Sequence, residues 1–211
     1  MMENANFPET NGVQAVFNRC MDTIFSVLVG LGLSAACGFR VFVPLLIMSI
    51  AAISGHLSLA PGFAWIGTWP ALVAFAVATG LEVAGYYVPW VDHFLDTVAT
   101  PAAVVAGTVV TAAMISNMDP FLKWSLAAIA GGGLAGLVQG ATVLTRGAST
   151  LTTGGLLNPL VATAELGGST IAATMALVAP VLVLLTIGLV VAFAAKRLGP
   201  SRTGPGLSST S

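Results

Sequence analysis

Hydrophobic residues in this chain occur in long runs, separated by short segments rich in glycine, proline and polar residues. The first run covers residues 23–54, which is longer than the roughly 20 residues that cross a bilayer once. Gly38 and Arg40 interrupt this run near its middle, and Pro44 follows about one helical turn later. Such a break allows one long kinked helix or two half-helices that meet at Arg40, and the sequence leaves both open.

Further apolar runs predict more helices. Three of them are long enough for one span each and cover residues 69–88, 97–115 and 121–144. Residues 146–155 are rich in Ser, Thr and Gly, and the apolar piece at 156–166 is too short to cross alone. The last run, residues 169–195, is long and contains Pro180. The pattern predicts an all-α membrane protein, a compact bundle of about six transmembrane helices with broken or re-entrant segments.

Two pairs of segments resemble each other. Residues 32–38 read GLSAACG and residues 133–140 read GLAGLVQG, and each is followed by a Pro-Leu pair. Inverted repeats in transporters leave weak traces of this kind, although a chain rich in Gly and Ala can also produce them by chance. An inverted repeat is therefore one interpretation of the pattern.

Composition supports the membrane interpretation. Of the 211 residues, 56% are hydrophobic and only 7% are charged, whereas a soluble domain carries about 25% charged residues. The net charge of -1 offers no basic surface for nucleic acid. We expect one transmembrane domain at 23–197, a polar segment at 1–22 and a disordered Gly-, Pro- and Ser-rich tail at 198–211. Cys20 and Cys37 have no metal-site spacing, and no cofactor is expected.

Basic residues near the ends of the apolar region suggest an orientation. They are Arg19, Lys196, Arg197 and Arg202. An even number of crossings places all four on one side, which the positive-inside rule assigns to the cytoplasm, together with both termini. Arg146 is then expected on that side and Lys123 on the other.

Arg40 and Glu82 place charges inside apolar runs. An ionised side chain at the centre of a bilayer is costly unless it is paired or hydrated. Arg40 is interpreted as an anion or carboxylate contact in a polar cavity, as a structural salt bridge to Glu82 or Glu165, or as a snorkelling side chain. Glu82 is interpreted as a proton carrier or cation ligand, or as the partner of Arg40.

The motif GGLLNP at residues 154–159 predicts a helix break, with Glu165 shortly after it. Backbone groups freed at membrane depth are tolerated only where they are buried in protein or line a wet cavity. Asn158 and Glu165 are the candidate side chains here, and Gln139 is expected to face the same cavity. The alternative is a simple re-entrant turn capped by Asn158.

Asp92, His93 and Asp96 form the densest polar group in the chain. Two aspartates four residues apart share a helix face, and the histidine beside them suits a polar or metal cluster. The alternative is an N-cap with a second acid in the first turn, where the helix dipole favours negative charge.

Gly132, Gly136 and Gly140 form a small-residue stripe of the Gly-x-x-x-Gly type. Such stripes usually mark close helix packing, within one chain or between subunits. A homo-oligomer formed through this stripe is therefore one possibility.

Three segments together resemble a known family. They are GLSAACGFRVFVPLL at residues 32–46, Glu82 with PWVDHFLDTVATPAAVVAG at 89–107, and TTGGLLNPLVATAE at 152–165. In this order they resemble a family of bacterial membrane proteins known as domain of unknown function family 4126. The resemblance implies a conserved fold in the bacterial cytoplasmic (inner) membrane, and it implies no activity.

Familiar enzyme motifs are missing from the sequence, which favours a role other than catalysis, and no catalytic residue is named. The first hypothesis is a small-solute or ion transporter or channel with a polar midplane cavity. Its candidate binding residues are Arg40, Glu82, Gln139, Asn158 and Glu165. The alternatives are a membrane scaffold or lipid-handling module, and a membrane enzyme that acts on a lipid headgroup through Asp92, His93 and Asp96.

Overall fold

The computed structural model describes residues 9–87, 89–179, 182, 185 and 189. Its α-helices are α1 Glu9–Cys37, α2 Phe42–Ile53, α3 Trp69–Gly85, α4 Pro89–Met114, α5 Pro120–Leu126, α6 Gly133–Thr153 and α7 Asn158–Val178. A 3₁₀ segment, η1, covers Pro61–Gly67, and a π-helical segment, η2, covers Ala127–Gly132. The described residues contain no strand, which confirms the all-α prediction.

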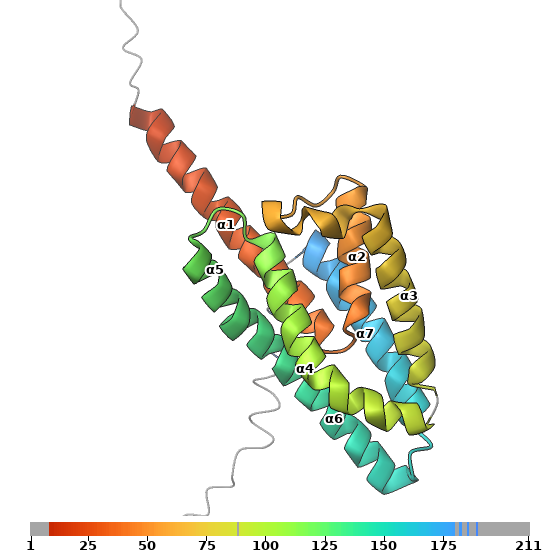
Figure 1. Cartoon of the computed structure of the whole chain (residues 1–211). Coiled ribbons are helices and arrows are strands. Elements are labelled where there is room, and N and C mark those ends of the chain that lie inside the picture. Colours follow the sequence, from red (N-terminus) through yellow and green to blue (C-terminus); the bar gives the residue numbers. More distant parts are fainter. Residues whose placement is uncertain (1–8, 88, 180–181, 183–184, 186–188, 190–211) are drawn as a thin grey trace, which may run out of the picture.

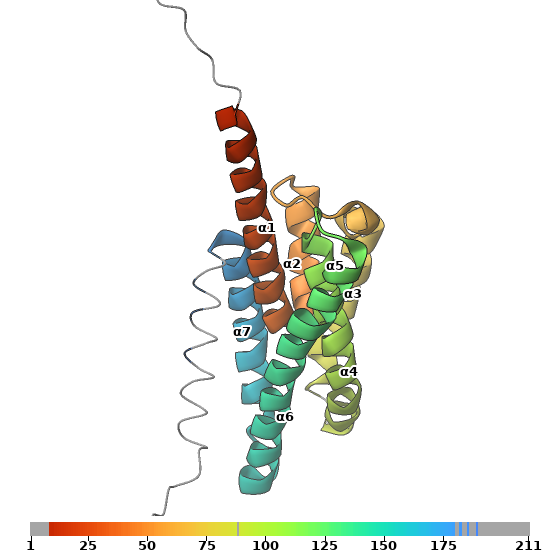
Figure 2. The same ribbon diagram turned by 90° about the vertical axis from the view of Figure 1, so that its left-hand side faces the viewer.

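Helices α1 and α2 form a hairpin that reverses inside the body of the protein. In Figures 1 and 2, α1 descends from a protruding N-terminal end to mid-height, and α2 returns to the end where α1 entered. In agreement, Val29 of α1 and Ile50 of α2 line the same pocket, although the chain turns between them at Gly38–Val41. Residues 23–53 therefore fold back on themselves as a hairpin.

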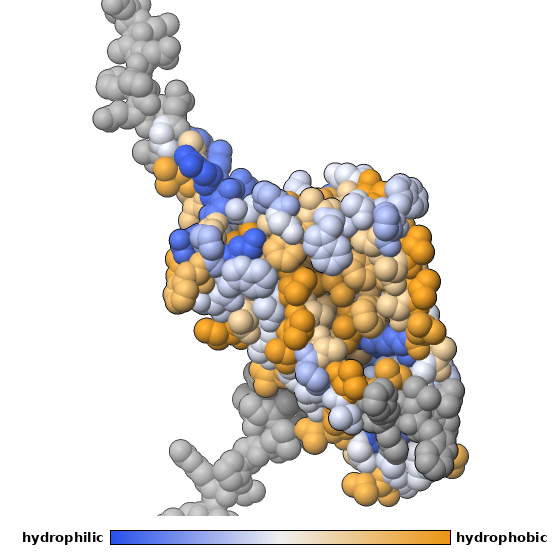
Figure 3. Space-filling model, viewed as in Figure 1, coloured by the Kyte–Doolittle hydropathy of each residue, from blue (hydrophilic) through white to orange (hydrophobic). Residues whose placement is uncertain are grey.

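Four helices are long and apolar enough to span a bilayer. They are Gln14–Cys37, Thr97–Met114, Pro120–Thr153 and Asn158–Val178. The pair η1 and α3, bent by 65°, is a fifth candidate. Apolar side chains cover the middle of the body in Figure 3, and hydrophilic ones gather where α1 protrudes. The chain is thus a multi-pass membrane protein, whereas the predicted count of about six helices is not confirmed in a structure that describes little beyond residue 179.

The Ser-, Thr- and Gly-rich segment 146–155 is more helical than its composition suggested. Helix α6 continues to Thr153, and α5, η2 and α6 run without a break from Pro120. Threonine hydroxyls in this stretch donate to the carbonyl oxygens four residues earlier, as from Thr152 to Ala148 at 2.8 Å. Because these hydroxyls are satisfied within the helix, they do not compete with it for backbone groups. The composition of this segment therefore gave no sign of its helix.

Small residues bring α1, α4 and η2 into close contact. A Cβ added to Gly131 would lie 2.9 Å from the carbonyl oxygen of Gly107, so the two backbones nearly touch. The Ser34 hydroxyl donates to the Gly131 carbonyl, and the Thr111 hydroxyl donates to the Gly30 carbonyl at 3.2 Å. These hydrogen bonds fix the C-terminal part of α1 against two neighbouring helices.

The predicted glycine stripe is used within the chain. A Cβ on Gly132 would lie 3.1 Å from the carbonyl oxygen of Val104 in α4, and one on Gly136 would lie 3.0 Å from a Val104 methyl group. Gly140 alone has nothing within 4 Å of that position. The stripe is therefore an intrachain contact, and Gly132 and Gly136 do not offer a free surface to a second copy.

The two segments of the suspected repeat lie in helices that run in the same direction. Ser34 contacts Gly131, and one turn further along both helices Gly38 packs against Ala135 and Val138. An inverted repeat requires opposite directions, so this arrangement of α1 and α6 does not support it.

The positions of Lys123 and Arg146 correct the orientation argument. Lys123 lies over Phe63 at the end of the bundle that α1 enters, so it shares that end with Arg19. Arg146 lies deep in the bundle beside the hairpin turn. Neither residue lies where the orientation argument placed it in the bundle, and which end faces the cytoplasm stays a prediction.

Candidate functional site

Charged side chains from several helices converge on the turn between α1 and α2. We call this group the buried charge cluster, and its members are Arg40, Glu82, Tyr86, Arg146 and Glu165. All five are less than 9% exposed. The helical path along α3 from Trp69, near the end of the bundle, to Glu82 is about 20 Å, so the cluster lies well within membrane depth.

Arg40 occupies the hairpin turn itself and is 1% exposed. Its Nη2 donates to the carbonyl oxygen of Ala162 in α7 at 2.8 Å. The same nitrogen lies 3.7 Å from Oε2 of Glu165, so the two residues form an ion pair. Of the two predicted salt-bridge partners, Glu165 is the one that Arg40 contacts.

Glu82 binds the N-terminus of α2. Its Oε1 accepts the backbone N–H of Val41 at 2.8 Å, and its Oε2 accepts that of Phe42 at 3.1 Å. The first N–H groups of a helix have no partner within the helix, and the helix dipole favours a negative charge there. Glu82 therefore fastens α2 to α3, and it forms no direct ion pair with Arg40 in the part of the chain that the structure describes.

Arg146 and Glu165 form a two-point ion pair between α6 and α7. Nε of Arg146 donates to Oε1 of Glu165 at 3.0 Å, and Nη2 donates to Oε2. Two parallel charge-assisted hydrogen bonds of this kind are among the stronger polar contacts in proteins. Because both residues are buried, removal of either would leave a charge with less compensation.

Tyr86, at the C-terminal end of α3, contacts both arginines. The Cζ atom of Arg40 lies 3.9 Å from the centroid of its ring, and that of Arg146 lies 4.0 Å from the same centroid. The electron-rich face of an aromatic ring attracts a guanidinium group, most strongly where water is excluded. The ring therefore helps to hold two positive groups near each other inside the bundle.

Arg40 retains hydrogen-bonding capacity in this setting. Its Nε and Nη1 are buried and have no hydrogen-bond partner in the part of the chain that the structure describes. A buried donor without a partner costs free energy, and more so when it is charged. Because a guanidinium group only donates, these two nitrogens can be satisfied by an acceptor such as water, a carboxylate or another anion.

Helix α6 carries a polar face into the bundle. Its buried residues are Ala135, Gln139, Thr142, Arg146 and Ser149, which follow helical spacing. Leucines at 137, 144 and 151 lie outward and are at least 72% exposed, as expected of a helix whose outer face meets lipid. Gln139 thus faces inward, about two turns from Arg146 along the helix. That it shares a cavity with Asn158 stays a prediction.

Asn158 is the first residue of α7 and is half-buried. Its Nδ2 donates to the Thr150 hydroxyl at 3.3 Å, which ties the start of α7 to the end of α6. Gly154 and Gly155 adopt positive φ angles of 64° and 86°, a common way to end a helix. The predicted break is present and joins two long helices, so the alternative of a simple re-entrant turn does not describe this segment.

Asp92, His93 and Asp96 belong to the first turns of α4, and their side chains lie outside the described residues. Their role as a polar or metal cluster stays a prediction. Among the described residues, no group of three or more His, Cys, Asp or Glu side chains is placed to hold a metal ion.

Sequence reasoning missed Tyr86 and Arg146. Arg146 was considered only for the orientation of the chain, although the spacing of Gln139, Thr142 and Arg146 follows one helix face. Tyr86 has no comparable signal because an aromatic residue at the end of a span is common at membrane interfaces.

Two pockets in the described part of the chain lie away from the cluster. One, of about 530 Å³, is mostly apolar and lies between α1, α2 and α7, with His56 at its margin. The other, of about 510 Å³, lies between η1 and α5 and includes Lys123.

Comparison with known proteins gives a family and nothing more specific. No curated protein and no solved structure matches the chain. A family described as "Domain of unknown function (DUF4126)" matches residues 27–198, a stretch that contains the whole buried charge cluster. The resemblance seen in the sequence motifs is confirmed, and the chain belongs to the DUF4126 family.

Proposed function

We propose that the protein is a membrane transporter of a small solute or ion, that its binding site is the buried charge cluster, and that the solute is anionic. The single observation that carries this proposal is the state of Arg40. It is almost fully buried, it lies at the turn of the α1–α2 hairpin, and two of its three guanidinium nitrogens lack a partner among the described residues.

A purely structural role explains Arg40 less well. Arg146 and Glu165 already form a two-point ion pair, so Arg40 adds a second positive charge to a carboxylate that has its main partner. Such a charge is costly in a membrane unless it is paired or hydrated. Intramembrane charges commonly mark solute or ion pathways. The unpaired Nε and Nη1 of Arg40 favour reversible binding of an anion inside the bundle.

The helix break supports the same interpretation. Many transporters bind solutes where a helix is interrupted at membrane depth, because the free helix end supplies a partial charge and backbone donors. Here the N-terminus of α2 lies at the cluster, and Glu82 from α3 holds its first N–H groups. A change at Glu82 would alter how α2 is held, which offers a route from proton or solute binding to movement of the hairpin.

A non-transporting scaffold is the second candidate. The two-point contact between Arg146 and Glu165 favours it, since a complete ion pair can serve simply to lock α6 to α7. The headgroup enzyme remains a hypothesis that rests on Asp92, His93 and Asp96.

Transport can be tested with the full chain in proteoliposomes. Uptake of inorganic anions and short carboxylates would be measured for the wild type, for Arg40→Gln and for Arg40→Lys. Arg40→Gln should lower flux about tenfold or more, the equivalent of losing a hydrogen bond to a charged group. Arg40→Lys keeps the charge with fewer fixed donors and should retain part of the flux.

Arg19→Gln is the matched control, because Arg19 lies on the exposed part of α1 far from the cluster. It should transport like the wild type. Absence of flux for every anion in tight wild-type vesicles would contradict the proposal, and so would full flux in a folded Arg40→Gln variant.

A further inference from the structure

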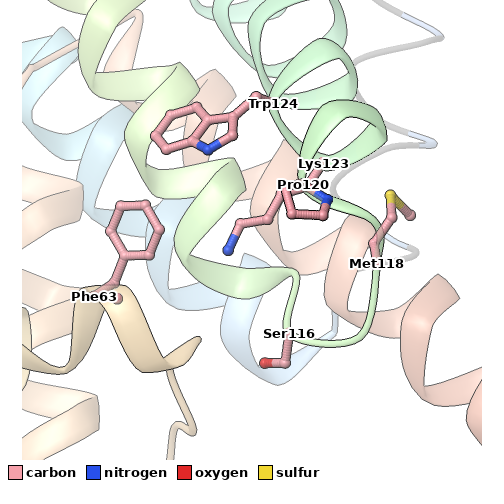
Figure 4. Close-up of a pocket in the computed structure, with 7 residues that line it drawn as sticks. Phe63, Ser116, Met118, Pro120, Lys123 and Trp124 are labelled. Carbon is pink, nitrogen blue, oxygen red and sulfur yellow. The ribbon is translucent and has the colours of Figure 1, made fainter.

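We propose that the pocket between η1 and α5 binds the headgroup of an anionic phospholipid of the phosphatidylglycerol type. The pocket has a volume of about 510 Å³ and lies at the end of the bundle opposite the α6–α7 connection. Its lining residues are Gly62, Phe63, Ser116, Met118, Pro120, Lys123 and Trp124 (Figure 4). This inference does not depend on the proposed transport function.

The pocket lies at the level of the membrane interface. Trp65 and Trp69 lie at the junction of η1 and α3, and Trp124 follows Lys123 in the first turn of α5. All three tryptophans are exposed, at 47–69%. Tryptophans gather at the depth of lipid headgroups, so this end of the bundle meets the headgroup layer.

Lys123 provides a positive charge that no described carboxylate pairs with. Its Nζ lies 5.0 Å from the centroid of the Phe63 ring, and its side chain reaches from α5 towards η1 in Figure 4. It forms no salt bridge with any carboxylate that the structure describes. The nearby carboxylate of Asp119 accepts the backbone N–H groups of Phe121 and Leu122, so it is engaged as a helix cap.

The other polar groups of the pocket suit a phosphodiester headgroup. The Trp124 indole N–H is a donor, and the Ser116 hydroxyl both donates and accepts. A lysine ammonium binds a phosphate as a point charge, whereas it repels the cationic group of a zwitterionic lipid. A glycerol headgroup adds hydroxyls that a serine can bind, which favours phosphatidylglycerol over phosphatidylcholine.

The surface beside the pocket favours a lipid over a free phosphate. Phe121, Leu122 and Ile129 are 77%, 57% and 79% exposed on α5 and η2, in the direction that leads from the interface into the membrane. An acyl chain attached to the bound headgroup would pack against these apolar side chains. A free anion would gain nothing from them.

The test is a lipid titration of the full-length protein in detergent, read out by native mass spectrometry. Phosphatidylglycerol would be compared with phosphatidylcholine for the wild type, Lys123→Gln and Lys123→Arg. The wild type should bind phosphatidylglycerol about fivefold more tightly than phosphatidylcholine. This is the effect expected of one basic side chain near an anionic lipid. Lys123→Gln should lose this preference, and Lys123→Arg should keep it.

Two results would overturn the proposal. One is an unchanged lipid preference in Lys123→Gln, confirmed as folded by circular dichroism. The other is full competition by millimolar inorganic phosphate, which would assign the pocket to a soluble anion. Because Lys123 is remote from Arg40, anion flux in Lys123→Gln reports separately on the transport site.

Discussion

At the scale of single residues, Glu82 and Glu165 are two buried carboxylates whose partners differ in kind. Glu82 accepts two backbone N–H groups, whereas Glu165 faces the guanidinium groups of Arg146 and Arg40. A neutral amide can still accept one N–H, but it cannot balance a buried cation. The two glutamates should therefore respond differently to the same substitution.

Glu165→Gln is expected to destabilise the protein more than Glu82→Gln. We expect a loss of about 3–5 kcal/mol for Glu165→Gln, because a buried ion pair is broken, and about 1–3 kcal/mol for Glu82→Gln. Thermal unfolding of the detergent-solubilised variants would measure the difference. Asp119→Asn is the control, since asparagine caps a helix about as well as aspartate. Equal losses for the two glutamates would contradict the assigned partners.

Part of this site could be predicted from the sequence. Arg40, Glu82 and Glu165 stand out because charges are rare in apolar runs. Their partners could not be predicted, because Glu82 could have formed an ion pair with Arg40 or hydrogen bonds with the N-terminus of α2. The turn of the hairpin brings Val41 and Phe42 against α3, so Glu82 binds their backbone N–H groups and not Arg40.

At the scale of elements, the hairpin depends on a close crossing of α1 and α6. A Cβ on Gly38 would lie 2.5 Å from Cβ of Val138 and 2.6 Å from the carbonyl oxygen of Ala135. The second contact involves backbone, so it cannot be relieved by a side-chain rotation. The helices themselves would have to separate.

Gly38→Ala should therefore destabilise the protein by about 1–3 kcal/mol, as overpacking does elsewhere. Gly140→Ala in α6 is the matched control, since nothing lies within 4 Å of its added methyl group and alanine favours a helix over glycine. It should be neutral or slightly stabilising in the same thermal measurement. A Gly38→Ala variant as stable as the wild type would show that α1 and α6 pack less closely than described.

Some boundaries of the helices could be predicted from the sequence and others could not. The break at Gly38–Arg40 was predicted because glycine and a charge interrupt a long apolar run. The helix at 146–153 was not predicted. The segment is rich in Ser, Thr and Gly, and this composition hid the helical spacing of its buried polar residues. The direction of α2 could not be predicted either, since hydropathy is the same whether a segment crosses or folds back.

At the scale of the whole molecule, the hairpin fixes which ends lie on the same side of the membrane. If α1 and α2 return to their starting side, the exposed Cys20 and Ser54 share that side. Leu156, which is 84% exposed between α6 and α7, lies at the opposite end of the bundle. A single crossing by residues 23–53 would instead place Ser54 away from Cys20.

Cysteine labelling in membrane vesicles distinguishes these topologies. In a Cys37→Ala background, a membrane-impermeant maleimide should label Cys20 and, in a second variant, Ser54→Cys with Cys20→Ser, from the same side. Leu156→Cys with Cys20→Ser should be labelled only in vesicles of the opposite orientation. Labelling of Ser54→Cys together with Leu156→Cys would mean that residues 23–53 cross the membrane. Arg40 would then no longer lie at the tip of a hairpin, and the argument for an anion site at its unpaired nitrogens would lose its structural basis.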